Sequence, residues 1–353
     1  MQNSHTLTDC CRRYVGKLLK RESLSESDIE TLFHHLLSDS ATELTDVESA
    51  LLSGLLVAIA MKGESVGELV GAARGMRRHA NRIQVIGSPV VDIVGTGGDS
   101  LDTFNISTTS MFVAAGAGLV IAKHGNRAAS GRCGSADVLE WCGVNLNIPP
   151  ERVEEQISQI GIGFMFAQRF HPAMRRVGPL RKRLGFRTLF NLLGPLTNPA
   201  GASCVLLGVY APQLTEMFAE ALRQLGCRRA MVVHGYDGMD ELTVTTHSRV
   251  TELIEGRIRT YDFFPEHYFD GVLTDPDELR GGDAMVNGDI LRGILEGNIR
   301  DGKRNIVLLN AAAAIFCAGR AKSMEEAIRK ASDSIDSGAA MDKLNNMIKL
   351  SQR

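Results

Sequence analysis

The chain has 353 residues, of which 44% are hydrophobic and 23% are charged. These values are close to those of ordinary globular proteins, so they exclude a disordered or fibrous chain, and the length allows two domains. The 39 basic and 41 acidic residues leave a net charge of −2, which gives no general attraction to nucleic acid or to an anionic membrane.

The start of the chain and its cysteines bear on the cellular compartment. The first residues lack the apolar core of a signal peptide, and the longest apolar run, near 51–61, is too short to span a bilayer. The seven cysteines include no CxxC pair and no zinc spacing, which is typical of a reducing compartment. The sequence therefore predicts a soluble, cytoplasmic protein with no membrane partner.

Residues 1–84 are predicted to form a small helical domain. Apolar residues recur there at helical spacing, and three pairs have the spacing of a capping box: Ser25 with Asp28, Thr45 with Glu48, and Ser65 with Glu68. Residues 51–61 are apolar on nearly all sides of their helix. This segment is buried either in the core of its own chain or in a contact between subunits, and the first alternative is favoured.

From Val90 onward the pattern changes to short apolar runs that alternate with helical segments. This alternation predicts an α/β domain over residues 85–353, with a central, mainly parallel sheet flanked by helices. An antiparallel hairpin is expected within 241–262, with a turn at Glu255-Gly256. The expected strands are 90–94, 119–122, 162–166, 204–210 and 229–234, and the expected helices include 135–142, 212–225 and 305–316.

The stretch 90–110 has the features of a phosphate site. A β-branched strand is followed by a glycine loop, GTGGD (95–99), whose residues without a Cβ let backbone amides approach an anion. Asn105, Ser107 and Thr108 then supply polar side chains and an N-cap for a helix that aims its positive end at the same point. The alternative is an ordinary tight turn that binds nothing.

Two further clusters follow later strands or precede helices. KHGNR (123–127) offers cations, an amide and a glycine at the end of a strand, where open α/β sheets bind ligands, although a basic loop is often only solvated. SGRCGS (130–135) places small residues before a helix, which also describes an ordinary turn.

The remaining two clusters are charged. The basic run 171–187 suggests a grip on a carboxylate or phosphate, or a nucleic-acid patch, and the balanced net charge favours the first alternative. Asp240 and Glu241 lie in a loop after the strand 229–234. Such adjacent carboxylates suit Mg²⁺, which typically bridges one or two carboxylates to substrate phosphates.

Taken together, these motifs resemble one family along nearly the whole chain, the anthranilate phosphoribosyltransferases of tryptophan biosynthesis. Several of the motifs are long and specific. The order that carries the resemblance is GTGGD (95–99), FNIST (104–108), KHGNR (123–127), GSADVLE (134–140), FHPAM (170–174), RLGFRTLFNLLGPLTNPAG (183–201), DGMDE (237–241) and LLNAAAA (308–314).

The resemblance implies roles for individual residues. Those implied to bind phosphoribosyl diphosphate (PRPP) are Gly95, Gly97, Gly98, Asp99, Thr103, Asn105, Ser107, Thr108, Lys123 and Ser135. Those implied to bind anthranilate are Gly95, His124, Asn126, His171, Arg181 and Gly194. Mg²⁺, as two ions, is implied to be held by Ser107, Asp240 and Glu241.

The resemblance also implies an architecture and partners. It implies that helical parts near 175–200 belong to the helical domain and that hinge segments connect this domain to the α/β domain. Catalysis is expected in a cleft. A homodimer is expected to form through the helical domain, and no nucleic-acid partner is expected. The sequence departs from the family where Gly131 and Cys133 replace the usual serines, which bears on PRPP affinity more than on the type of reaction.

The implied chemistry is displacement of pyrophosphate from the anomeric carbon of the sugar by the amino group of anthranilate. Such a reaction needs charge neutralisation and close placement of the amine rather than a covalent nucleophile, and no Ser-His-Asp or Cys-His arrangement is evident. Three alternatives remain. They are a sister phosphoribosyltransferase with another aromatic acceptor, an enzyme like the pyrimidine nucleoside phosphorylases, and a nucleic-acid-binding relative.

Overall fold

The computed structural model describes residues 6–38, 42–87, 89–99, 101–128 and 132–353. The chain forms two compact units, and each is traversed twice by the chain. The first comprises Met1–Arg82 with Ala167–Pro199, and the second comprises Ile83–Phe166 with Ala200–Arg353. Among the described residues, none of the helices has the length and apolar character needed to cross a membrane.

The described residues of the first unit form helices and the turns between them. Its helices are α1 (Leu7–Leu18), α2 (Glu26–Ser38), α3 (Asp46–Lys62), α4 (Val66–Arg78), α8 (Ala167–Phe170), α9 (Gly178–Leu184) and α10 (Leu189–Leu193), with short 3₁₀ turns at Pro172–Arg176 and Gly194–Leu196. All three predicted capping boxes form, because the backbone N–H of Ser25, Thr45 and Ser65 each donates to the acidic side chain three residues later.

Helices α2 and α4 pack very closely, and two glycines of α4 explain why. A Cβ built on Gly71 would overlap the backbone carbonyl oxygen of Glu26, and one built on Gly75 would press against the Cβ of Phe33. Phe33 in turn packs on Phe190 of α10, with ring centroids 5.3 Å apart. The segment 167–199 is thereby built into the core of the helical unit.

The second unit contains one seven-stranded sheet with the order β3-β2-β1-β4-β5-β6-β7. Strands β1 to β5 run parallel, and the last two pairings are antiparallel. The strands are β1 (Val90–Gly95), β2 (Val120–Gly125), β3 (Ile162–Phe166), β4 (Cys204–Gly208), β5 (Arg229–Gly235), β6 (Ser248–Ile254) and β7 (Arg257–Phe263).

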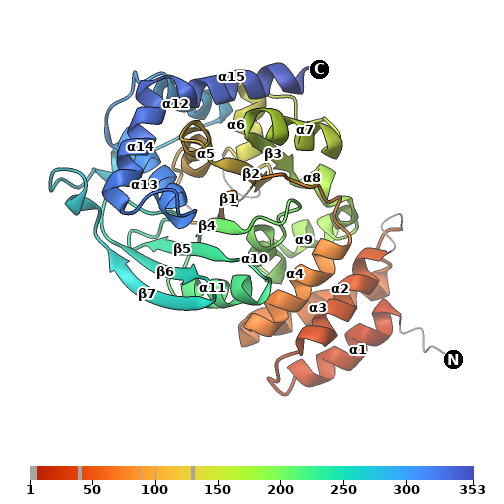
Figure 1. Ribbon diagram of the computed structural model, residues 1–353. Coiled ribbons are helices and arrows are strands. Elements are labelled where there is room, and N and C mark those ends of the chain that lie inside the picture. Colours follow the sequence, from red (N-terminus) through yellow and green to blue (C-terminus); the bar gives the residue numbers. More distant parts are fainter. Residues whose placement is uncertain (1–5, 39–41, 88, 100, 129–131) are drawn as a thin grey trace. The chain divides into compact units, whose positions relative to one another are not determined.

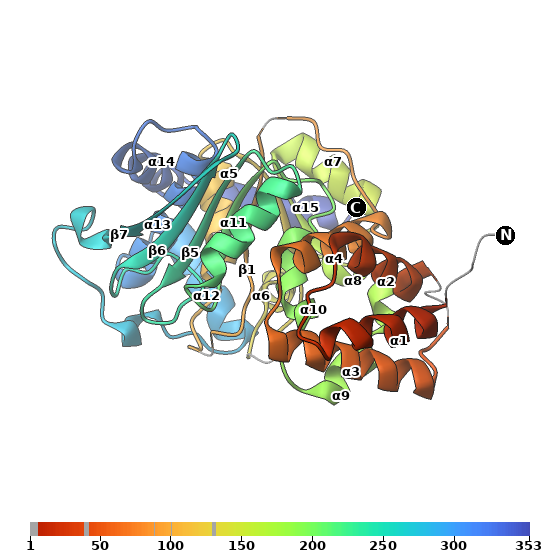
Figure 2. The same cartoon turned by 90° about the horizontal axis from the view of Figure 1, so that it is seen from below.

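Helices cover both faces of this sheet. Figures 1 and 2 show α11 on one face, and α5 and α13 on the other. The core between them is apolar, and α13 buries the run from Ile306 to Ile315 almost completely. The helices of this unit are α5 (Ile106–Gly116), α6 (Ser135–Trp141), α7 (Pro150–Ile160), α11 (Leu214–Gln224), α12 (Ala284–Leu295), α13 (Gly302–Cys317), α14 (Met324–Asp336) and α15 (Ala339–Ser351).

The sequence-based fold class is confirmed, and the predicted strands lie where expected with small shifts at their ends. The hairpin is confirmed only for its second part, since β6 begins at Ser248 and the residues before it form no strand. Glu255 and Gly256 both have positive φ, 44° and 84°, which matches the twist of a tight hairpin.

Candidate active site

The candidate site lies at the carboxyl ends of β1 and β4. Chain order in the sheet reverses there, since β2 lies on one side of β1 and β4 on the other. Ligands of open α/β sheets bind at such a switch point. Gly95 and Gly208 are paired at these strand ends. A Cβ on Gly95 would overlap the Asp240 carboxylate, and a Cβ on Gly208 would overlap the Asp240 carbonyl oxygen. The two glycines therefore make the space that Asp240 occupies.

The loop that carries Asp240 and Glu241 is held from both sides. The Asp237 carboxylate accepts hydrogen bonds from the hydroxyls of Thr243 (2.6 Å) and Thr245 (2.5 Å). On the other side, the buried amide of Asn310 in α13 bonds to both the N–H (3.1 Å) and the C=O (2.8 Å) of Leu242. The polar run after the loop, which predicted a strand, therefore serves to fix the loop instead.

Three carboxyl groups converge at this point, Asp99, Asp240 and Glu241. Burial and the nearby Asp99 raise the pKa of Asp240 to about 7, although the backbone N–H of Gly97 donates to it at 2.7 Å. Burial and the Asp240 charge raise the pKa of Glu241 to about 8, and burial also raises the pKa of Asp99. This cluster is therefore short of positive charge.

Lys123 is a cation whose charge acts on both Asp240 and Glu241. It lies on β2 with only 2% of its surface exposed, and its Nζ donates to the Ile93 carbonyl oxygen and to Ser107 Oγ, the latter at 3.3 Å. Burial lowers its pKa, while the charges of Asp92, Glu241 and Asp240 oppose that shift. Lys123 thereby ties the sheet to the start of α5.

The start of α5 differs from the sequence-based prediction in one respect. Asn105 occupies the N-cap position, but its side chain makes no capping hydrogen bond. Its amide donates instead to the Cys133 carbonyl oxygen at 3.2 Å, because that loop passes close to the helix start. Thr108 Oγ1 reaches Ser135 Oγ at 2.9 Å in the same way.

These contacts bring several of the predicted site segments together in the α/β unit. Gly97 and Gly98 have φ values of 67° and 82°, which only glycine adopts easily, and Thr103 forms an isolated bridge with Arg280. Gly131 lies outside the described residues. The Asn310 and Asn287 side chains, which sequence analysis did not select, hold the loops of this cluster.

His124 and Asn126 also lie in this unit, on β2 and just after it. The backbone N–H of His124 donates to Asp92 at 3.2 Å, and the Asn126 side chain accepts from the N–H of Arg127 at 2.8 Å. Arg127 itself pairs with Asp137 and Glu140, so its charge is used within the unit.

His171, Arg181 and Gly194 belong to the helical unit. Thr197 connects two of them, because its carbonyl oxygen lies 3.0 Å from His171 Nε2 and its N–H donates to the Gly194 carbonyl at 3.3 Å. Burial lowers the pKa of His171 to about 4, so the ring is neutral at pH 7. The Arg181 guanidinium stacks 5.5 Å from the centroid of Phe190, and burial lowers its pKa.

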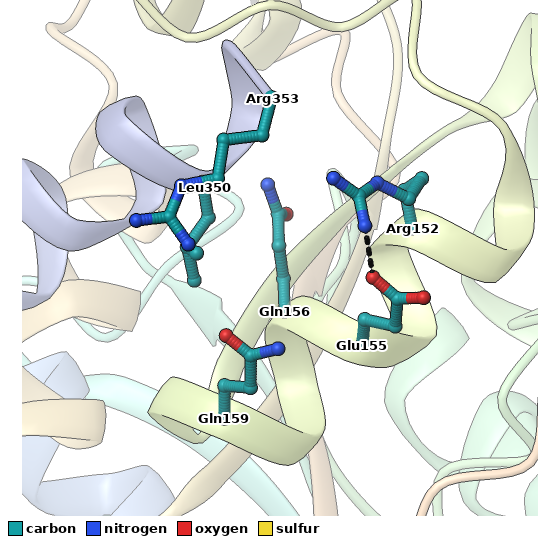
Figure 3. Close-up of a pocket in the computed structure, with 6 residues that line it drawn as sticks. All are labelled: Arg152, Glu155, Gln156, Gln159, Leu350 and Arg353. Atoms are coloured by element: carbon teal, nitrogen blue, oxygen red, sulfur yellow. Dashed lines mark hydrogen bonds and ion pairs between the residues drawn. The ribbon is translucent and has the colours of Figure 1, made fainter.

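A small pocket of about 30 Å³ lies elsewhere in the α/β unit, between α7 and α15 (Figure 3). Arg152 and Glu155 pair with each other within it. Its lining contains none of the predicted site residues: Arg152, Glu155, Gln156, Gln159, Leu350 and Arg353. The volume suits a water molecule rather than a substrate.

The described residues contain no group of three or more His, Cys, Asp or Glu side chains arranged to hold a metal ion by themselves. A metal bound at Asp240 and Glu241 would therefore need further ligands from a substrate or from water. This need is typical of Mg²⁺, which usually keeps several waters and binds substrate phosphates.

Comparison with known proteins gives consistent matches over nearly the whole chain. A family model described as "Glycosyl transferase family, a/b domain" matches residues 87–341, and one described as "Glycosyl transferase family, helical bundle domain" matches residues 12–80. Anthranilate phosphoribosyltransferase of Syntrophobacter fumaroxidans is 52% identical over 95% of this chain and 97% of its own length.

Solved structures show the same similarity. Anthranilate phosphoribosyltransferase of Thermus thermophilus has a TM-score of 0.88 and 41% identity, covering 96% of this chain and 99% of its own. The Saccharomyces cerevisiae enzyme in complex with PRPP and Mg has a TM-score of 0.88 and 27% identity, covering 97% and 98%. Another structure of the yeast enzyme, with a TM-score of 0.87, 26% identity and 98% coverage of both chains, contains 4-fluoroanthranilate.

Proposed function

Because this chain belongs to the glycosyl transferase family of the anthranilate phosphoribosyltransferases, we propose that it transfers the phosphoribosyl group of PRPP to the amino group of anthranilate. The products are N-(5-phosphoribosyl)anthranilate and pyrophosphate, and the reaction is a step of L-tryptophan biosynthesis. The observation that carries this proposal is the convergence of a glycine loop, a helix N-terminus, Lys123 and the Asp240-Glu241 pair at the switch point of the sheet.

PRPP occupies the α/β part of the site in this proposal. Gly97 and Gly98 let the backbone approach the phosphate groups closely, and the start of α5 faces them, which the helix dipole favours. The contacts of Asn105 with Cys133 and of Thr108 with Ser135 support this assignment, because they hold the loop before α6 against the start of α5. Gly95, Asp99, Thr103 and Ser107 complete the proposed set.

Mg²⁺ accompanies PRPP, and the donor set fits it. Carboxylate and hydroxyl oxygens of Asp240, Glu241 and Ser107 are the hard ligands that Mg²⁺ prefers. The backbone N–H of Ser107 bonds to the Glu241 side chain, so the two residues are neighbours. We assign two ions to this site. When bound, Mg²⁺ neutralises the diphosphate that departs.

The reaction needs little covalent chemistry from the chain. The transition state at the anomeric carbon is oxocarbenium-like, and the amine of anthranilate is neutral at pH 7, so it attacks without prior deprotonation. The chain must hold the two substrates in line and stabilise the leaving charge, which oriented amides and Lys123 do at low cost in reorganisation.

Anthranilate is proposed to contact His124, Asn126, Gly95, His171, Arg181 and Gly194. Two properties support this assignment. The guanidinium of Arg181 has an aromatic ring as its neighbour in place of an acid, so it can take a carboxylate as its partner. His171 is neutral at pH 7 and therefore does not compete for that carboxylate.

We also propose that the chain forms a homodimer through its helical unit. Val47 and Met61 of α3 are 55% and 85% exposed. They align at alternating spacings of four and three residues with Leu51, Gly54 and Ala58, none of which is fully buried. Residues at these spacings lie on one side of a helix, and such an exposed stripe is typical of the surface along which two helices pair.

Two further parts of the proposal concern location and partners. All seven cysteines are free thiols, which supports a cytoplasmic location. The balanced charge supports an enzyme without a nucleic-acid partner.

The direct test is pyrophosphate release from a mixture of protein, Mg²⁺, PRPP and anthranilate, with each component omitted in turn. The proposal requires release only in the complete mixture. Release with another aromatic amine but not with anthranilate would indicate a sister transferase. Phosphorolysis of a pyrimidine nucleoside without Mg²⁺ would indicate a phosphorylase.

A further inference from the structure

The segment 279–287 lies against the start of α5, far from it in sequence. The backbone N–H of Phe104 donates to Leu279 at 3.2 Å, and that of Gly281 donates to Asp102 at 2.9 Å. The fit is tight, because a Cβ on Gly281 would lie 2.6 Å from the backbone of Phe104. Asn287, in the first turn of α12, is 2% exposed and lies at this junction.

A chain of three hydrogen bonds runs through Asn287 in one direction. The N–H of Gly282 donates to Asn287 Oδ1 at 2.7 Å, and Asn287 Nδ2 donates to Asn105 Oδ1 at 2.9 Å. Asn105 Nδ2 then donates to the Cys133 carbonyl oxygen at 3.2 Å. A backbone donor stands at one end and a backbone acceptor at the other, so neither amide can be flipped without losing bonds.

This series of hydrogen bonds connects three segments that the proposed function places around PRPP or directly behind it. Asn105 begins α5, whose N-terminal end faces the proposed phosphates. Cys133 precedes Ser135, and the Cys133 thiol is also within hydrogen-bonding reach of Asn287. The third segment, 281–287, reaches the other two through the bond from Asn287 to Asn105 and through the backbone bond from Gly281 to Asp102, so its contribution is to orient them.

We propose that Asn287 is a positioning residue for PRPP binding, and this inference rests on the proposed function. By fixing the direction of the Asn105 amide, Asn287 sets the loop at Cys133–Ser135 against the N-terminus of α5. Both elements then present their donors to one diphosphate group. A binding site whose donors are fixed beforehand does not have to order them when the ligand arrives.

The variant Asn287→Asp tests this inference. It keeps the size of the side chain and the acceptor for Gly282, but an ionised carboxylate cannot donate to Asn105. We expect the Kd and KM for PRPP with Mg²⁺ to rise about tenfold or more, since a buried donor is lost and an acceptor is left unpaired. We expect kcat and the KM for anthranilate to change less than about threefold. Asn345→Asp, the same change on the exposed face of α15, is the matched control and should bind PRPP as the wild type does.

A pH series separates positioning from general damage. A protonated aspartic acid at 287 can donate to Asn105 again, so the ratio of the variant Kd to the wild-type Kd should fall as pH is lowered from 8 to 5.5. A ratio that stays constant over this range would overturn the directional role. Circular dichroism and thermal melting at each pH establish that the variant is folded.

If Asn287→Asp does not fold, a double-mutant cycle with Asn287→Ala and Asn105→Ala gives the second measurement. The inference requires the two losses of PRPP affinity to be clearly non-additive, and additive losses would overturn it. Calorimetry of the wild type with PRPP and Mg²⁺ comes first. If the wild type does not bind PRPP, both the proposed function and this inference are contradicted. If the wild type binds PRPP and Asn287→Asp binds it with the same Kd, only the inference is contradicted.

Discussion

Asp240 and Glu241 bind protons more tightly in the folded chain than in the unfolded one. Burial and their acidic neighbours raise the pKa values to about 7 and about 8. A carboxyl group with a raised folded-state pKa makes the free energy of unfolding fall as pH rises from its unfolded pKa, about 4, toward its folded value. His171 acts oppositely, because its pKa of about 4 makes unfolding easier as pH falls below about 6.5.

The variant that combines Asp240→Asn with Glu241→Gln should therefore be more stable than the wild type in metal-free buffer, and increasingly so from pH 5 to pH 8. His171 is present in both proteins, so its contribution to the pH dependence cancels when the two free energies of unfolding are subtracted. Turnover at limiting Mg²⁺ should fall roughly a hundredfold or more, because the metal loses its protein carboxylates. Melting curves across the pH range and pyrophosphate release measure the two effects.

The control for this variant is Asp333→Asn with Asp342→Asn, which removes two exposed carboxylates from α14 and α15. It should leave both turnover and the pH dependence of stability close to those of the wild type. Full turnover of the Asp240 and Glu241 variant at limiting Mg²⁺ would exclude the pair from the metal site.

Arg181 and Arg183 offer a comparison of two neighbouring cations. Arg181 is half-buried against Phe190, whereas Arg183 is exposed. Arg181→Ala should lower kcat/KM for anthranilate about ten- to a hundredfold, the worth of a hydrogen bond to a charged group, and should leave the KM for PRPP nearly unchanged. Steady-state kinetics in both substrates decide it. Equal damage to both substrates, or greater damage from Arg183→Ala, would contradict the assignment.

At the scale of single residues, the sequence indicated those that belong to a motif with a distinctive chemical pattern. It missed the residues whose role is to hold other residues in place. Asp240, Glu241 and Lys123 stand in motifs whose residue types suggest phosphate and metal chemistry. Asn287 and Asn310 are single amides on helices, and nothing in their local sequence shows that they reach Asn105 and Leu242. The loss of side-chain capping by Asn105 has the same origin, since its amide is used by a loop that is close only in the folded chain.

At the scale of elements, the parallel strands were predictable because strands buried on both faces are continuous apolar runs. The structure of the polar run after Glu241 was not predictable from the sequence. Alternating threonines favour a strand as much as they favour the hydrogen bonds to Asp237 that they make here. Gly95 was predicted to follow its strand, whereas Gly208 fell inside the expected strand 204–210, and the contact of both glycines with Asp240 required the fold.

Replacing Gly208 with alanine tests that contact. The new Cβ would overlap the backbone carbonyl of Asp240, so the loop from Asp237 to Glu241 must move or the strand end must shift. We expect the free energy of unfolding to fall by about 1–3 kcal/mol. Expressed as free energy, the loss of Mg²⁺-dependent turnover should be larger than this. Denaturant unfolding and kinetics measure these.

Gly16→Ala is the matched control, because nothing lies within 4 Å of a Cβ at this position inside α1. It should stabilise the chain by about 0.5–1 kcal/mol through helix propensity. A Gly208→Ala variant with wild-type turnover would show that the Asp240 loop does not depend on the empty space at β4.

At the scale of the whole molecule, the order of long motifs identified the family, and the family determined the expected architecture. What a single sequence could not supply was the choice between an internal and an intersubunit role for residues 51–61. In the structure one face of α3 is internal, since Leu52, Leu55, Leu56 and Ile59 are buried, while Val47 and Met61 lie exposed on another face, where the proposed subunit contact would form.

The proposed dimer is tested by placing a charge on the exposed stripe of α3. Leu51→Glu together with Met61→Glu should convert a dimer into a monomer, because two unpaired carboxylates would be buried in each half of the seam. Analytical ultracentrifugation measures the mass in solution. Val272→Glu, a similar change at a 67% exposed position of the α/β unit, should leave the mass unchanged. A wild-type monomer at micromolar concentration would refute the dimer.

The two outer strands of the sheet bear on how the chain avoids aggregation. An uncovered strand edge is a template on which another chain can add a strand. At one end of the sheet, one face of β3 packs against α7. At the other end, the edge strand β7 carries Arg257 and Arg259, and Arg259 pairs with Glu252 of the neighbouring strand β6 and lies against the ring of Tyr261. The antiparallel hairpin thus ends the sheet in a strand that carries charged side chains, and such charges disfavour the addition of a strand from a second molecule.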